Sequence, residues 1–199
     1  MAEVWQPISV AEAVQLMESL DVAWWIAGGW ALDLHAGRQT REHEDLDIGI
    51  AWSDHLRVQR ALAGQWQLYK THQPGLAPWP PGEALQEPVH DVWVRRHDSS
   101  LWAFQLMLVD VTEGEWVYRR LPEIRRPLAS VVTATREGIP YLRPEVQLLY
   151  KGGSSARRPK DLEDFRRMLP ALRAAEIRWL RDSLARQFPA GHEWLAELG

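Results

Sequence analysis

The sequence predicts an α+β fold, in which a mixed β-sheet is flanked by helices and followed by a helical region at the C-terminal end. Two observations predict this class. Segments with the alternating or continuous apolar pattern of β-strands dominate up to about Arg126, and amphipathic helical segments dominate from about Pro144. We therefore expect a core domain over residues 1–128 and a helical region over residues 129–199.

The first part of the chain alternates between helices and strands. Ser9 and Glu12 form a capping-box pattern, and apolar residues at helical spacing follow as far as Leu20. Gly37 is suited to end a short helix, and Ser53 is expected to cap a further one. The predicted order is helix 9–20, strand 23–27, helix 30–36, strand 46–51, helix 53–63 and strand 66–72.

A proline-rich segment then separates these elements from a predicted hairpin. Residues 73–88 contain five prolines, which predicts a loop that is either a lid or specificity rim, or a tolerated insertion. The polar link 97–100 joins two apolar strand patterns as a hairpin. Strands are predicted over 89–96, 101–111 and 114–120, and amphipathic helices over 143–151, 159–172, 176–188 and 192–198.

Composition excludes several classes of protein. A net charge of -4 and the lack of a long basic run argue against general affinity for nucleic acid. The absence of cysteine excludes disulfides and cysteine metal sites. The N-terminal segment does not have the pattern of a signal peptide, and no apolar run approaches the ~18 residues that span a bilayer. We expect a cytoplasmic protein without a membrane partner, and the oligomeric state stays open.

Asp45 and Asp47 are the first candidates for chemistry. Side chains two residues apart on a strand project from the same face, so the two carboxylates are expected to lie together. Such a pair repels unless a cation sits between the carboxylates, and oxygen ligands of this kind favour Mg²⁺. The alternative for an isolated Asp-x-Asp is a solvated end of a strand.

Gly28 and Gly29 lie between a predicted strand and a predicted helix. Glycine lets the backbone approach a ligand closely, and a helix N-terminus offers unpaired N–H groups and a positive dipole end. This arrangement suits a phosphate group, although a Gly-Gly turn by itself is a weak signal. A phosphate site and a carboxylate pair within one short segment together predict a nucleotide–Mg²⁺ site for phosphoryl or nucleotidyl transfer.

The segment 28–50, GGWALDLHAGRQTREHEDLDIGI, resembles the signature of the DNA polymerase beta-type nucleotidyltransferase superfamily. The similarity is closest to the aminoglycoside and lincosamide nucleotidyltransferases, with their Gly-Gly-Trp-Ala, Gly-x-x-Thr-Arg-x-His and Asp-x-Asp elements. Several spacings agree at once between Gly28 and Asp47. Beyond this segment the resemblance is looser, and the order of elements agrees as far as about Phe165.

The resemblance implies the nucleotidyltransferase fold and a reaction in which a hydroxyl of a small, aminoglycoside-like acceptor attacks the α-phosphate of ATP or another NTP. It implies that Asp45 and Asp47 hold Mg²⁺ and that Gly28 and Gly29 meet the phosphates. Arg41 is expected to contact phosphate, with a salt bridge to a neighbouring glutamate as the alternative. The resemblance also implies transfer of an NMP, with AMP as the first choice.

Two lysines and two loop residues complete the group of candidate site residues. Lys151 and Lys160 are candidates for contact with the triphosphate, with solvated surface lysines as the alternative. Thr40 and His43 match the motif and are expected to shape the loop.

Family members normally supply a third carboxylate from a later strand, where it binds metal or deprotonates the acceptor. The expected position holds Gln105, which has no acidic group, and Asp110 is predicted to face the other way. If the hairpin is centred near Asp98, Asp91 lies directly opposite Gln105 on the same face. We therefore predict that Asp91 replaces the missing acid. The alternative is that Asp91 is only a polar residue of its strand.

Two other functions remain open at this point. A nucleotidyltransferase of the toxin–antitoxin type would act on a macromolecule, although the absence of a basic patch argues against a nucleic-acid substrate. A degenerate module would bind nucleotide without turnover, and Gln105 is the residue that keeps this alternative open.

Overall fold

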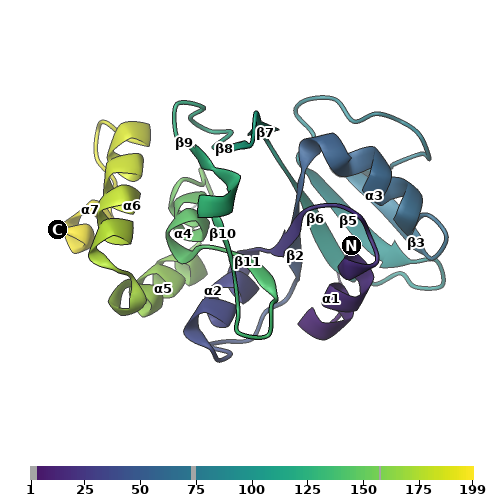
Figure 1. The fold of residues 1–199 in the computed structure, drawn as a ribbon, viewed down its shortest axis with the longest axis horizontal. Helices are drawn as coiled ribbons and strands as arrows, with labels where there is room; N and C mark the ends of the chain where they lie inside the picture. Colours follow the sequence, from purple (N-terminus) through teal and green to yellow (C-terminus); the bar gives the residue numbers. More distant parts are fainter. Residues whose placement is uncertain (1–3, 73–74, 157) are drawn as a thin grey trace.

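The computed structural model describes residues 4–72, 75–156 and 158–199. Its centre is an eight-stranded sheet of order β10-β11-β1-β2-β6-β5-β3-β4 (Figure 1). The pairs β1–β11 and β2–β6 are parallel and the other neighbours are antiparallel, so the expected α+β fold with a mixed sheet is confirmed. The strands are β1 (Trp24–Ile26), β2 (Asp47–Ala51), β3 (Trp66–His72), β4 (Gly75–Pro78), β5 (Asp91–Arg96), β6 (Phe104–Val109), β10 (Val132–Ala134) and β11 (Pro140–Leu142).

Helices flank the sheet and gather beyond one end of it, where α4 to α7 lie together on the left of Figure 1. The capping box predicted at Ser9 is present, and Gly37 ends α2 in the left-handed conformation. Ser53 lies within the 3₁₀ turn Trp52–Asp54, and the N-cap of α3 is Asp54, so the prediction for Ser53 was wrong. The helices are α1 (Val10–Glu18), α2 (Gly28–Ala36), α3 (His55–Leu62), α4 (Pro144–Gly152), α5 (Pro159–Met168), α6 (Ala174–Gln187) and α7 (Leu195–Leu198).

The predicted meander continues into a separate small sheet. Glu113 and Gly114 adopt positive φ values of 52° and 80°, and this tight turn reverses the chain. As a result β7 (Val111–Thr112), β8 (Glu115–Val117) and β9 (Arg125–Pro127) pair with one another and not with the large sheet. The link between β8 and β9 contains Arg119 and Arg120, which line a cleft at the start of β2.

The proline-rich segment 73–88 contains a strand as well as loop. β4 pairs antiparallel with β3, and Pro78 is tolerated because β4 is an edge strand. Gln73 and Pro74 lie outside the described residues, so the loop prediction is not assessed there. The rest of the segment folds back, with the Trp79 indole donating to the Glu83 carbonyl at 2.8 Å.

One face of the sheet belongs to the hydrophobic core. Val92 and Val94 of β5 are fully buried in one apolar cluster with Val58 and Leu62 of α3. Because side chains alternate along a strand, Asp91 and its neighbours at odd-numbered positions face the other side. The acidic and polar residues of β2, β5 and β6 thus share the face that α3 does not cover.

The boundary predicted after residue 128 stays a prediction. β10 and β11 follow that residue and complete an edge of the large sheet, next to β1. Across the part of the chain that the structure describes, no helix is both long and apolar enough to cross a membrane.

Candidate active site

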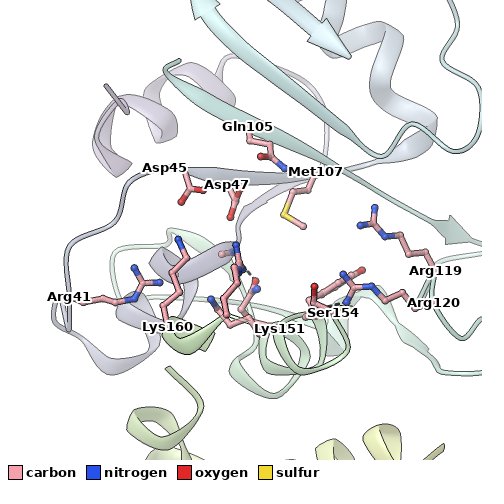
Figure 2. A pocket seen from close by; sticks show the side chains of 15 residues that line it. Arg41, Asp45, Asp47, Gln105, Met107, Arg119, Arg120, Lys151, Ser154 and Lys160 are labelled. Atoms are coloured by element: carbon pink, nitrogen blue, oxygen red, sulfur yellow. Dashed lines mark hydrogen bonds between the residues drawn. The ribbon is translucent and has the colours of Figure 1, made fainter. Parts of the chain in front are cut away.

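A cleft opens where the start of β2 faces the N-terminal end of α2 and the helices α4 and α5 (Figure 2). Seven of the eight residues predicted for the site line it, and the eighth, Asp91, hydrogen-bonds to a lining residue. The lining residues are Gly28, Gly29, Arg41, Asp45, Asp47, Gln105, Met107, Arg119, Arg120, Gln147, Tyr150, Lys151, Ser154, Arg158 and Lys160.

Asp45 and Asp47 point into this cleft side by side, as Figure 2 shows. Asp47 is the first residue of β2 and Asp45 lies just before the strand, which continues its alternation. Burial, followed by the negative charges of Asp45 and Asp91, raises the pKa of Asp47 to about 7. A carboxylate held this way is stabilised by a cation, so the donor set suits a hard divalent metal ion.

The raised pKa of Asp47 predicts a pH-dependent stability. The folded protein binds the Asp47 proton more tightly than the unfolded chain, so the stabilisation is present at low pH and is lost as the pH rises through about 7. In EDTA, Asp47→Asn should therefore raise the free energy of unfolding by about 1–3 kcal/mol at pH 8. The gain should shrink towards pH 4. Denaturant unfolding of both proteins across this range measures it, and a gain independent of pH would contradict the raised pKa.

Gly28 and Gly29 have a steric reason to be glycine. Gly28 has a φ of +65°, and a Cβ on it would meet the Asp47 carboxylate at 2.1 Å. A Cβ on Gly29 would meet the His43 ring at 2.3 Å. The Gly28 N–H donates to the Gln147 side chain at 2.8 Å, which ties the start of α2 to α4. The two glycines therefore let the carboxylate loop close against the helix N-terminus.

Asp33 organises the loop between α2 and β2. Its buried carboxylate accepts a hydrogen bond from Thr40 Oγ1 at 2.5 Å and contacts His43 Nε2 at 2.5 Å. Trp30 packs on the His43 ring, with centroids 4.8 Å apart. In the structure Thr40 and His43 hold the loop in shape, in line with the prediction for these two residues.

Asp91 lies on the predicted face but in a different register. The strand pairing places Asp91 opposite Met107 and Trp93 opposite Gln105, a shift of two residues from the predicted pairing. A shift of two keeps the side chain on the same face. The Gln105 side-chain amide donates to Asp91 at 2.9 Å, and Gln105 itself is paired directly with Asp47 on β2. Gln105 is thus a neighbour of both acids: its side chain bonds to Asp91, and its position on β6 is paired with Asp47.

Asp110 lies outside the cleft lining, beyond the end of β6. Burial raises its pKa, and its oxygens lie near His90 and Glu87. The structure thus keeps Asp110 apart from the Asp45–Asp47 pair.

The predicted cations line the cleft, but all three form ion pairs there. Arg41 Nε and Nη2 contact the two oxygens of Asp164 at 2.8 and 2.9 Å, so its partner is not the neighbouring glutamate expected as the alternative. Lys160 contacts Glu44 at 3.0 Å. Lys151 is buried and contacts Asp161 and Asp164, each at 2.9 Å, so the alternative of a solvated surface lysine is wrong.

Asp164 is the centre of a charge network that joins the segment before β2 to α4 and α5. The hydrogen bond from Arg41 and the charge of Lys151 lower the pKa of this carboxyl to about 2, against the opposing effect of burial. Asp164→Asn leaves buried Lys151 with one carboxylate, so we expect a loss of about 3–5 kcal/mol of stability. Asp182→Asn, in an exposed pair with Arg181, is the control and should change stability by less than about 1 kcal/mol. Equal denaturation midpoints for the two variants would contradict this role.

Sequence reasoning missed three arginines that line the cleft. Arg158 contacts Asp161 at 2.8 Å, and Arg119 and Arg120 enter from the link between β8 and β9. The charged pair Arg119–Arg120 after an apolar strand was a visible signal. It could not be assigned to the cleft because the separate β7–β9 sheet, which carries it there, was not predicted.

Comparisons with known proteins agree with this geometry. Residues 9–73 match the family described as Aminoglycoside-2''-adenylyltransferase. A stretch of 35 residues is 46% identical to a lincosamide resistance protein of Staphylococcus haemolyticus, and covers 18% of this chain and 22% of that protein. The matched stretch therefore spans about a fifth of the curated relative's length.

Solved structures share the fold over most of the chain. The lincosamide antibiotic adenylyltransferase LnuA, bound to lincomycin, superposes with a TM-score of 0.57 at 20% identity, covering 84% of this chain and 100% of that one. ANT(2'')-Ia in complex with adenylyl-2''-tobramycin gives a TM-score of 0.57 at 13% identity, covering 90% and 98%.

The fold is therefore that of the nucleotidyltransferases. The resemblance to the aminoglycoside and lincosamide nucleotidyltransferases is confirmed as well, because the family match includes the whole stretch from Gly28 to Asp47.

Proposed function

We propose that this protein is a Mg²⁺-dependent nucleotidyltransferase that moves an NMP, with AMP as the first choice, from an NTP to a hydroxyl of a small, aminoglycoside-like acceptor. The observation that carries the proposal is the arrangement in one cleft of Asp45 and Asp47 against the N-terminal end of α2. The family match over residues 9–73 supports the adenylyl group and an antibiotic-like acceptor.

The donor set supports a magnesium site. Asp45 and Asp47 offer oxygen ligands, and the pKa of Asp47 is raised by burial and then by the negative charges of Asp45 and Asp91, which a divalent cation relieves. When bound there, Mg²⁺ would neutralise charge that develops on the phosphates and orient them. The proposed enzyme therefore uses Mg²⁺, with ATP or another NTP as co-substrate.

The chain's own residues would hold the reactants and one proton. The acceptor oxygen bonds to the α-phosphorus, the bond from that phosphorus to the bridging oxygen breaks, and pyrophosphate leaves. Gly28 and Gly29 allow close approach of the phosphates to the helix N-terminus. Asp91, held by the Gln105 amide, accepts the hydroxyl proton. Arg41, Lys151 and Lys160 would supply positive charge around the phosphates, largely through the ion pairs in which they already take part.

The acceptor is proposed from chemistry and similarity together. Two structural neighbours were solved with lincomycin and with adenylyl-2''-tobramycin bound, and both are hydroxylated small molecules. The net charge of -4 suits a polycationic acceptor. The cytoplasmic location expected from the sequence remains a prediction.

Pyrophosphate release tests the proposal. The purified protein is incubated with Mg²⁺, each NTP in turn, and a panel of aminoglycosides, lincosamides and other hydroxyl compounds. Release that needs both an acceptor and Mg²⁺, with a matching mass gain on the acceptor, is the expected result. NTP binding without release for any acceptor would favour the degenerate binding module, and transfer only to a protein or tRNA would favour the macromolecular alternative.

A further inference from the structure

The positive charges of the cleft differ in whether a carboxylate already neutralises them. Four cations of the lining form ion pairs within 3.0 Å: Arg41 with Asp164, Lys151 with Asp161 and Asp164, Arg158 with Asp161, and Lys160 with Glu44. The pKa of Asp164 is lowered to about 2, so this partner stays ionised at neutral pH. An incoming phosphate must compete with these carboxylates for their cations.

Arg119 and Arg120 form the other end of the cleft, across from Arg41 and Lys160 in Figure 2. Arg120 Nη1 donates to the Tyr150 carbonyl at 2.6 Å and to the Tyr118 hydroxyl at 3.2 Å. These partners are neutral, so the guanidinium is held in place and its charge is not cancelled. Burial raises the pKa of Tyr118, which keeps the hydroxyl uncharged at neutral pH.

The Arg119 side chain makes no hydrogen bond or ion pair with any residue in the described ranges 4–72, 75–156 and 158–199. Burial raises the pKa of Asp110, and the charge of Arg119 opposes this rise less than the charge of His90 does. Among the described residues, no ion pair joins Arg119 to Asp110. A half-buried guanidinium that lines a cleft without a partner of its own is ready to bind an anion.

We propose that the Arg119–Arg120 end of the cleft receives the terminal phosphates of the nucleotide, and hence the departing pyrophosphate. This inference rests on the proposed function and specifies it, because it assigns direct contact with the terminal phosphates to Arg119 and Arg120, while Arg41, Lys151 and Lys160 contribute positive charge from within their ion pairs. Binding there leaves the ion pairs of Arg41, Lys151 and Lys160 intact. Arg119 is then the polyphosphate-binding residue, and Arg120 is its fixed neighbour.

The same charges direct the acceptor elsewhere. Two arginines that no carboxylate of the described residues neutralises repel a polycationic acceptor, whereas the region around Asp45, Asp47 and Asp91 attracts one. The polyphosphate and the acceptor would therefore occupy different parts of the site, as an in-line displacement requires.

Binding of inorganic tripolyphosphate tests the assignment without requiring turnover. Its affinity for the full chain is measured by calorimetry with Mg²⁺ present, for the wild type, Arg119→Gln, Arg119→Lys and the control Arg125→Gln. Arg125 is an exposed residue of β9 that lies outside the cleft lining. We expect Arg119→Gln to weaken tripolyphosphate binding about 10- to 100-fold, Arg119→Lys to restore part of it, and Arg125→Gln to leave it unchanged. AMP, which lacks the terminal phosphates, should bind wild type and Arg119→Gln equally.

Two results would overturn the assignment. One is equal tripolyphosphate affinity in wild type and Arg119→Gln, and the other is an equal loss in Arg119→Gln and Arg125→Gln. Failure of the proposed function is distinguishable, since it would leave tripolyphosphate binding dependent on Arg119 while no acceptor releases pyrophosphate. Thermal unfolding of each variant, run in parallel, separates a loss of the site from a loss of the fold.

Discussion

Asp47→Asn is expected to lower nucleotidyl transfer by about a thousandfold or more. The substitution keeps the shape of the side chain but removes the negative charge from the residue that lies against Gly28 and beside Asp45. A neutral amide oxygen is a poor ligand for a divalent cation in place of a carboxylate. The measurement is the initial rate of pyrophosphate release with a responsive acceptor at saturating Mg²⁺.

The loss of transfer activity in Asp47→Asn can be distinguished from a loss of activity caused by unfolding. Without metal, Asp47→Asn should be more stable than wild type at pH 8, because the pKa of the native carboxyl is raised to about 7. Asp98→Asn, an exposed aspartate in the link between β5 and β6, is the matched control and should keep full activity. Transfer at more than about a tenth of the wild-type rate by Asp47→Asn would refute its role as a metal ligand.

Asp91→Asn is expected to lower the transfer rate about 10²- to 10⁴-fold, as for loss of a general base. The structure also predicts a rescue. Gln105 donates to Asp91 and is paired directly with Asp47, so a carboxylate at position 105 would project from the same face. The double variant Asp91→Asn/Gln105→Asp exchanges acid and amide between the two strands, and we expect it to recover a measurable part of the activity.

Single-turnover rates as a function of pH test this exchange. Rescue by the double variant, with a rate that again rises as the introduced acid ionises, is the expected result. Full turnover by Asp91→Asn alone would show that the proton leaves by another route. Gln105→Ala serves as the control for the hydrogen bond, since it leaves Asp91 ionisable but unsupported and should cost less than Asp91→Asn.

Local patterns in the sequence predicted much of the fold because the features involved act over a few residues. The capping box at Ser9 and the left-handed Gly37 depend on neighbouring backbone groups, and both are present. The carboxylate pair and the two glycines that begin α2 lie within one segment of 20 residues, so their spacing in the sequence was enough to predict the site.

The register of the β5–β6 hairpin depends on contacts with residues far away in the sequence, and local sequence patterns do not reveal such contacts. Trp102 and Ala103 exchange backbone hydrogen bonds with the N-terminal segment, through the Val4 carbonyl and the N–H groups of Gln6 and Ile8. β6 therefore begins only at Phe104, the hairpin loop is longer than the four residues predicted, and the pairing shifts by two. The predicted face of Asp91 is unaffected because side chains repeat with a period of two.

By itself, the sequence determined the chemistry of the segment 28–50. It showed which residues can bind a cation and where the backbone can approach a phosphate. Only the tertiary structure decided how the charges are distributed around it. Arg41 and Asp164 are 123 residues apart in the chain, and packing of α5 against the segment before β2 makes them partners. The link between β8 and β9 brings Arg119 to the same cleft, where no carboxylate of the described residues pairs with it. An ion pair depends on distance in space, so the cation that stays available for an anion is selected by the fold.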